Sequence, residues 1–139
     1  WIHRGLHPPL LYKPLHKRHH TYRVTTPFSS HAFHPVDGWL QATPYMLFAF
    51  LFPFHKWLHV FLLTAVNVWT ISIHDRAPVL ANHIINSSAC HDVHHRDFIY
   101  NYGQYFCFWD RFCGTYRDPS RLFTDRSIKG KHRIPLPKF

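Results

Sequence analysis

The sequence predicts an all-α fold in which an apolar helical hairpin inserts into a membrane, with a histidine-rich helical cap on one side. Two observations predict this fold. Between residues 38 and 74 the sole formally charged side chain is Lys56, and groups of histidines flank this apolar stretch at both ends. A hairpin that enters and returns leaves both flanks on one side of the membrane. Their excess of Lys and Arg predicts that this side is cytosolic.

The elements follow in order along the chain. Residues 1–37 are basic and contain five prolines, which predicts short helical pieces broken at proline. The apolar hairpin covers about residues 39–73 and splits at residues 53–56. Its second half has 17 residues and would extend roughly 26 Å as a helix, just enough for a bilayer core. The first half is shorter and carries Pro44, and a buried hairpin in a soluble protein remains the alternative. Residues 118–139 are expected to form a basic, loosely ordered C-terminal tail.

Composition excludes several classes of protein. Hydrophobic residues make up 46% of the 139 and aromatic residues 18%, too many for a disordered chain. Three cysteines cannot all pair with one another, and they suit free thiols in a reducing compartment. Attraction to anionic lipid head groups is sufficient to explain the net charge of +9. Binding of nucleic acid would not explain the apolar hairpin. The chain opens at Trp1 in the middle of a pattern, so we expect it to be a fragment.

Three histidine groups indicate metal binding. The first is an HxxxH motif and the other two are HxxHH motifs, and together they contain His3, His7, His16, His19, His20, His91, His94 and His95. Positions i, i+3 and i+4 share one face of a helix, so each HxxHH is expected to aim three imidazoles at one point. Eight ligands exceed the four that a structural zinc ion takes, which implies two metal ions. Imidazole binds iron, zinc, copper and nickel, so the ligand type leaves the metal open, and a basic, solvated surface is the alternative.

Four longer stretches carry a resemblance to a known family: WIHRGLHPPLLYKPLHKRHH, TPFSSHAFHPVDGWLQATPY, NVWTISIHD and YNYGQYFCFWDRFCGTYR. Over residues 1–117 the chain resembles the catalytic domain of the fatty acid hydroxylase/sterol desaturase superfamily. The stretch from His31 to Gly38 is most similar to its sterol C5-desaturase branch. Pro8 and Arg76 depart from the pattern, and this leaves the box histidines intact but makes the substrate less secure.

The resemblance implies a four-helix transmembrane bundle, of which this chain would hold half, with a cytosolic cap around two histidine-ligated iron ions. It implies a multi-pass protein of the endoplasmic reticulum membrane. The reaction would be O2-dependent introduction of a C5–C6 double bond into a Δ7-sterol. Electrons would come from NAD(P)H through cytochrome b5 and its reductase. A sterol C4-methyl oxidase or a fatty acid hydroxylase shares the same boxes, and a non-catalytic histidine-rich membrane protein that binds zinc is the alternative of another class.

The resemblance also assigns residues beyond the boxes. His74, at the end of the second apolar helix, becomes a ninth ligand. His31 and His34 become possible ligands, second-sphere groups or substrate-facing residues. Independently of the resemblance, the aromatic run from Phe98 to Trp109 suits a membrane-interface belt or the lining of the entry for a flat apolar sterol. The residues singled out in it are Tyr100, Tyr102, Tyr105 and Trp109. By position, Asp37, Asp75, Asp92 and Asp97 are candidates for orienting the imidazole rings.

Overall fold

A computed structural model describes residues 1–76 and 84–120 of the chain. Within these residues the fold is helical, and the sole extended pairing is an isolated antiparallel bridge between Ile85 and Phe106. The basic tail predicted for 118–139 lies, from residue 121 on, outside the described residues, as do His83 and His132.

The N-terminal segment consists of short helices, as its prolines predict. These are α1 (Ile2–Gly5), α2 (Pro9–Leu11), the π-helix η1 (Tyr12–His16), and the 3-10 helices η2 (His19–Thr21) and η3 (Pro27–His31). Pro9 and Pro27 stand in the first turns of α2 and η3, where the missing amide hydrogen removes no helical hydrogen bond.

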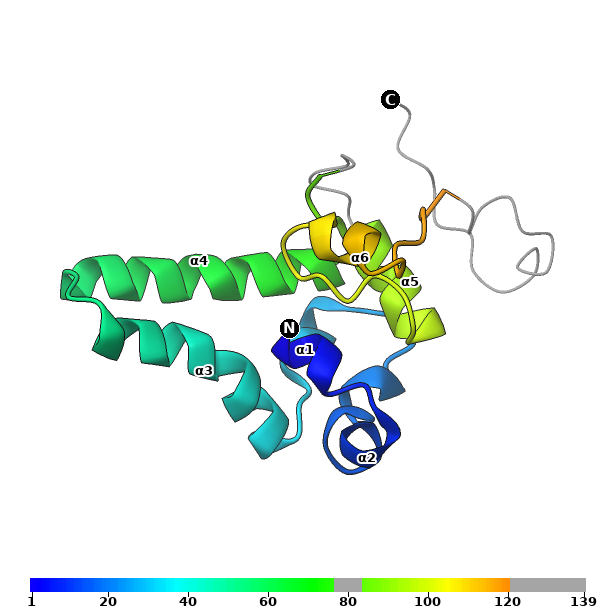
Figure 1. The fold of residues 1–139 in the computed structure, drawn as a ribbon, viewed down its shortest axis with the longest axis horizontal. Coiled ribbons are helices and arrows are strands. Elements are labelled where there is room, and N and C mark those ends of the chain that lie inside the picture. Colours follow the sequence, from blue (N-terminus) through cyan, green and yellow to red (C-terminus); the bar gives the residue numbers. More distant parts are fainter. Residues whose placement is uncertain (77–83, 121–139) are drawn as a thin grey trace.

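Two long helices follow. Helix α3 (Pro35–Leu51) starts four residues before the predicted apolar stretch, because the His34 side chain accepts a hydrogen bond from the Val36 amide and Pro35 opens the first turn. Helix α4 (Lys56–His74) is capped in the same way by His55. The helices leave a common turn at residues 52–55 and diverge toward the rest of the molecule (Figure 1).

Helix α4 is long and apolar enough to cross a membrane, and it is the one such helix among the described residues. Its most apolar 18-residue window is 17% buried, and large side chains such as Trp57 and Phe61 are more than 60% exposed. An apolar helix of this length in the core of a soluble domain would be mostly covered, so the exposure favours a lipid environment.

The remaining elements close over the open end of these two helices (Figure 1). They are α5 (Ser88–Asp97) and α6 (Phe108–Phe112), joined by a loop at residues 98–107. Ser87 caps α5 by accepting a hydrogen bond from the Cys90 amide. The apolar core here is small: the fully buried apolar side chains are Leu6, Ile73, Cys90, Val93 and Cys107. Among the described residues, buried polar side chains outnumber the apolar ones, and histidine is the most frequent of them. The histidines therefore form the centre of this part of the fold.

Candidate metal centre

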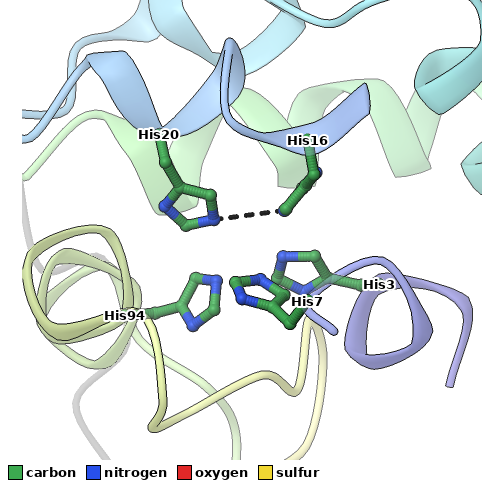
Figure 2. A group of neighbouring side chains, drawn as sticks. All are labelled: His3, His7, His16, His20 and His94. Atoms are coloured by element: carbon green, nitrogen blue, oxygen red, sulfur yellow. Dashed lines mark hydrogen bonds between the residues drawn. The ribbon is translucent and has the colours of Figure 1, made fainter. Parts of the chain in front are cut away.

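Nine histidines gather into two buried clusters. The five-histidine cluster contains His3, His7, His16, His20 and His94. The four-histidine cluster contains His19, His74, His91 and His95. Within each cluster, one ring nitrogen from every residue lies within 4.8 Å of all the others. Figure 2 shows the five-histidine cluster, with His16 and His20 facing His3, His7 and His94. These are the nine residues that the sequence assigned to metal binding.

The sharing of the two HxxHH motifs between the clusters corrects the sequence analysis. His16 and His20 enter the five-histidine cluster, and His19 enters the other. In α5, His91 and His95 enter the four-histidine cluster, and His94 enters the first. In α5, at 3.6 residues per turn, positions i and i+4 differ by about 40° around the helix, whereas i+3 and i+4 differ by about 100°. In the other motif, His16 and His19 lie in separate short helices, η1 and η2. Each HxxHH motif therefore supplies histidines to both clusters, and the expectation that its three rings aim at one point was wrong.

The outer nitrogens of five rings are fixed by hydrogen bonds. His16 Nδ1 lies 2.7 Å from Asp37 Oδ2, and both side chains are fully buried. Backbone carbonyl oxygens accept from Nδ1 of the other four: Tyr102 from His3, Thr70 from His74, Tyr100 from His94 and Tyr22 from His95. Since a carbonyl oxygen can only accept, Nδ1 carries the hydrogen in these four rings. Their Nε2 atoms therefore present lone pairs, the form in which imidazole binds a metal.

The inner nitrogens of several rings approach one another closely. His74 Nε2 lies 3.0 Å from His91 Nε2, and His91 Nε2 lies 3.2 Å from His95 Nε2. In the other cluster, His16 Nε2 and His20 Nε2 are 3.1 Å apart. Two ligands about 2.1 Å from one metal ion, at angles of 90–109°, would be roughly 3.0–3.4 Å apart. The spacing is thus that of ligands around a shared cation.

Unsatisfied polar atoms point to the same conclusion. Buried ring nitrogens of His7, His19, His20, His91 and His94 have no hydrogen-bond partner among the described residues. A buried, unpaired polar atom is costly, and so many in one place need a compensating group. For His7 and His94 the unpaired atom is Nε2, the atom directed into the cluster. A metal ion in the five-histidine cluster would use these two lone pairs, and the Nε2 atoms gathered in the four-histidine cluster offer the same kind of ligand. The residues present therefore fit the implied cofactor.

Burial also keeps the rings neutral. Desolvation, reinforced by neighbouring imidazoles, lowers the pKa of His3 from 6.5 to about 3 and that of His7 to about 2. Desolvation likewise lowers the pKa of His95 to about 2, and the pKa values of His91 and His94 lie well below the ordinary range. Metal ligands must be deprotonated, so these rings are prepared for an ion at neutral pH.

The two clusters are adjacent. The ring centroids of His20 and His95 are 4.7 Å apart, and those of His91 and His94 are 5.7 Å apart. Rings of the two clusters therefore pack in van der Waals contact, and two ions held there would share one buried environment.

The loop after α5 organises the five-histidine cluster. Its Tyr100 and Tyr102 carbonyls hold His94 and His3, as described above. The buried Asp110 carboxylate accepts from the Tyr102 and Gly103 amides and forms an ion pair with Arg4 at 2.9 Å. This network ties α1 to the loop and α6. From the sequence, Asp110 was expected to form a local ion pair with Arg111 that fixes the cap. Arg4 was not identified as its partner, since this contact joins residues 106 positions apart.

A cavity of about 360 Å³ lies beside the five-histidine cluster. Its wall includes His3 together with three of the four aromatic residues assigned to substrate contact, namely Tyr102, Tyr105 and Trp109. The fourth, Tyr100, packs its ring against the Arg117 guanidinium at 4.9 Å and is absent from the cavity wall. Gln41 and Tyr45 of α3 also line the cavity, and the sequence analysis did not single them out.

The remaining histidines of the described residues lie outside both clusters. His31 bonds to Ser30 Oγ and, at 2.9 Å, to Asn67 Oδ1 on α4. His34 caps α3 and His55 caps α4, while His59 packs near Phe54 at the turn between these helices. Among the candidate orienting carboxylates, Asp37 reaches a clustered histidine, whereas Asp92 and Asp97 face arginines.

Comparison with known proteins agrees with this geometry. The chain is 55% identical to lathosterol oxidase of Homo sapiens, over 99% of the chain and 45% of the relative. It is 53% identical to a Δ7-sterol 5(6)-desaturase of Aspergillus fumigatus, over 93% of the chain and 37% of the relative. It is also 53% identical to a Δ7-sterol 5(6)-desaturase of Eremothecium gossypii, over 92% of the chain and 36% of the relative. The chain thus spans less than half the length of these relatives.

No solved structure matches the chain. The fatty acid hydroxylase family model matches residues 1–115, which include all nine clustered histidines, the cavity wall and the Arg4–Asp110 network. The chain therefore belongs to the fatty acid hydroxylase family.

Proposed function

We propose that this chain carries the metal centre of a membrane-bound sterol desaturase that introduces a C5–C6 double bond into Δ7-sterols. The observation that carries the proposal is the pair of imidazole clusters beside an aromatic cavity. The chain reaches 53–55% identity to proteins named lathosterol oxidase or Δ7-sterol 5(6)-desaturase, and this similarity supports the substrate class and the position of the double bond.

The proposed cofactor is two iron ions. The five-histidine cluster would hold one and the four-histidine cluster the other, with His31 and His34 left outside both sets. Bound iron supplies the redox chemistry with O2 that cleaves unactivated C–H bonds, which no amino-acid side chain supplies. Overall, one hydrogen leaves each of C5 and C6, two electrons and two protons come from a donor, and O2 leaves as two waters.

The side chains have defined tasks in this reaction. The buried imidazoles stay neutral and hold their lone pairs toward the cluster centres, oriented by Asp37 and by the Tyr100 and Tyr102 carbonyls. The aromatic wall binds the flat, apolar rings of the sterol and excludes water from them. Tyr102 belongs to both parts, because its ring lines the cavity and lies 4.8 Å from the His7 ring.

The proposed location is the endoplasmic reticulum membrane, in a multi-pass protein whose clusters face the cytosol. The apolar, exposed surface of α4 supports membrane insertion, and the positively charged flanks of α3 and α4 support the cytosolic side. Cytochrome b5 and its reductase are the proposed electron donors, drawing on NAD(P)H, because the reaction consumes two electrons that the substrate does not provide.

The direct test is the sterol profile of cells that lack C5-desaturation after expression of the full-length protein. We expect Δ5,7-sterols to return with the wild type and to remain absent with His94→Ala at equal protein abundance. Persistence of Δ7-sterols despite good expression would refute C5-desaturation. Loss of C4-methyl sterols, or appearance of hydroxylated fatty acids, would instead assign a sterol C4-methyl oxidase or a fatty acid hydroxylase. Bound zinc without O2 consumption would indicate a non-catalytic metal-binding protein.

A further inference from the structure

Two tyrosine hydroxyls meet in the wall of the cavity beside the five-histidine cluster. Tyr45 of α3 and Tyr105 of the loop after α5 lie 60 residues apart in sequence, and their hydroxyl oxygens are 2.5 Å apart. Both side chains line the 360 Å³ cavity, whose wall also contains His3. The hydroxyl pair therefore lines the same cavity as a residue of the five-histidine cluster.

The pair retains unused hydrogen-bonding capacity. Two hydroxyl groups carry two protons, and the bond between them uses one. Within the part of the chain that the structure describes, neither oxygen has a further hydrogen-bond partner. Burial and the neighbouring Tyr45 hydroxyl raise the pKa of Tyr105 well above its ordinary value, so this hydroxyl remains a donor at neutral pH. The pair can offer a ligand one O–H donor and a lone pair.

Three other long polar side chains of the cavity wall are already engaged, and the Tyr102 hydroxyl is the competing candidate. Arg4 donates to Asp110 and to Thr115, Gln41 donates to Asp37 at 2.7 Å, and Gln104 donates to Thr70. Much of the remaining wall is apolar or aromatic, including Ile2, Pro44, Phe106 and Trp109. A mostly apolar cavity whose wall carries this hydroxyl pair suits an apolar ligand that carries one hydroxyl group.

We propose that the Tyr45–Tyr105 pair binds the 3-hydroxyl group of the sterol and thereby determines which carbon atoms face the metal centre. This inference rests on the proposed function, because it assumes a sterol in this cavity. The hydroxyl of a sterol is attached to C3, and C5 is two carbon–carbon bonds away. Anchoring that hydroxyl in the wall shared with His3 confines C5 and C6 to the region next to the five-histidine cluster.

The test compares a Δ7-sterol with its 3-deoxy analogue, using purified full-length protein in lipid nanodiscs. Equilibrium binding of both radiolabelled ligands is measured first, and kcat/KM for both is measured after addition of the electron donors. We expect the wild type to prefer the hydroxylated sterol about tenfold or more in both measurements. In Tyr45→Phe and Tyr105→Phe this ratio is expected to fall toward one, through weaker binding of the hydroxylated sterol alone. Tyr116→Phe is the matched control, because Tyr116 packs on Arg111 away from the cavity and its variant should keep the wild-type ratio.

Each outcome supports or overturns the inference. An unchanged ratio in both variants overturns it, and so does equal weakening of both ligands, which is what mere loss of packing would produce. Collapse of the ratio in Tyr102→Phe, with Tyr45→Phe and Tyr105→Phe unaffected, would transfer the role to Tyr102. Hydroxyl-dependent binding through the tyrosine pair without any desaturated product would support the inference and refute the proposed reaction. Desaturation with no preference for the 3-hydroxyl would support the proposed reaction and refute the inference.

Discussion

Asp37 is the one carboxylate that contacts a clustered histidine among the four candidates from sequence. Its Oδ2 holds His16 Nδ1 at 2.7 Å, and its Oδ1 accepts from Gln41 of the cavity wall. A carboxylate in this position orients the ring and makes it a stronger ligand. The contact links the five-histidine cluster to the neighbouring cavity through a single side chain.

Substitution of Asp37 tests this role. Asp37→Asn preserves the shape but removes the charge, so we expect metal affinity to fall by about 10–100-fold. Affinity is measured by competition with a chelator of known strength. Asp97→Asn is the control, because Asp97 pairs with Arg96 and Arg117 and touches no clustered ring. Equal affinity of Asp37→Asn and the wild type would remove Asp37 from the site.

The clustered histidines also predict a pH dependence. The folded pKa of His3 is lowered to about 3 and that of His7 to about 2, whereas the unfolded chain titrates near 6.5. Below pH 6.5 the unfolded state therefore binds protons that the folded state refuses, so protonation favours unfolding. The free energy of unfolding should be constant above pH 6.5 and decrease from there toward pH 3. Metal is lost over the same range together with the fold, because the unfolded histidines bind protons instead of metal.

Circular dichroism and metal analysis of the full-length protein between pH 8 and pH 4 measure this effect. We expect the thermal midpoint and the bound metal to decrease together below pH 6.5. Identical stability at pH 5 and pH 8 would show that the folded rings have ordinary pKa values, and full metal content at pH 5 would contradict the expected loss of metal.

At the scale of the elements, the two long helices were predictable from the sequence. The division of the histidines between two clusters was not. The apolar stretches became α3 and α4 because continuous apolar sequence leaves few alternatives to a long helix. The division of each HxxHH motif between two clusters depends on which side of η1, η2 and α5 each cluster occupies. That is decided by tertiary packing, which spacing alone does not contain.

The cavity is a second case in which composition was informative and tertiary packing was not predictable from the sequence. The aromatic composition of the loop after α5 indicated a surface for an apolar ligand, and three of its four named residues line the cavity. The pairing of Tyr105 with Tyr45 requires the loop to pass over α3, which follows from anchoring by Asp110 and Asn86. These anchors join distant segments, so the sequence offered no local signal for them.

For the whole molecule, the exposed apolar surface of α4 is the main determinant of where the protein resides. Ala65 is at the middle of α4 and is exposed. Ala65→Asp would place a charge at the centre of the proposed membrane span, at a cost of about 3 kcal/mol for insertion. We expect a reduced membrane-integrated fraction after carbonate extraction, with Ala65→Leu as the control. Normal recovery of Ala65→Asp in the membrane fraction would mean that α4 does not face lipid.

The central claim is that the nine histidines form two separate metal sites within one buried centre. Its most direct test is the iron content per chain of the anaerobically purified full-length protein. We predict about two iron ions for the wild type and about one each for His20→Ala and His91→Ala, which disable different clusters. His59 lies outside both clusters, so the His59→Ala variant should keep two iron ions. A wild-type content of one ion or none after iron reconstitution would contradict the account.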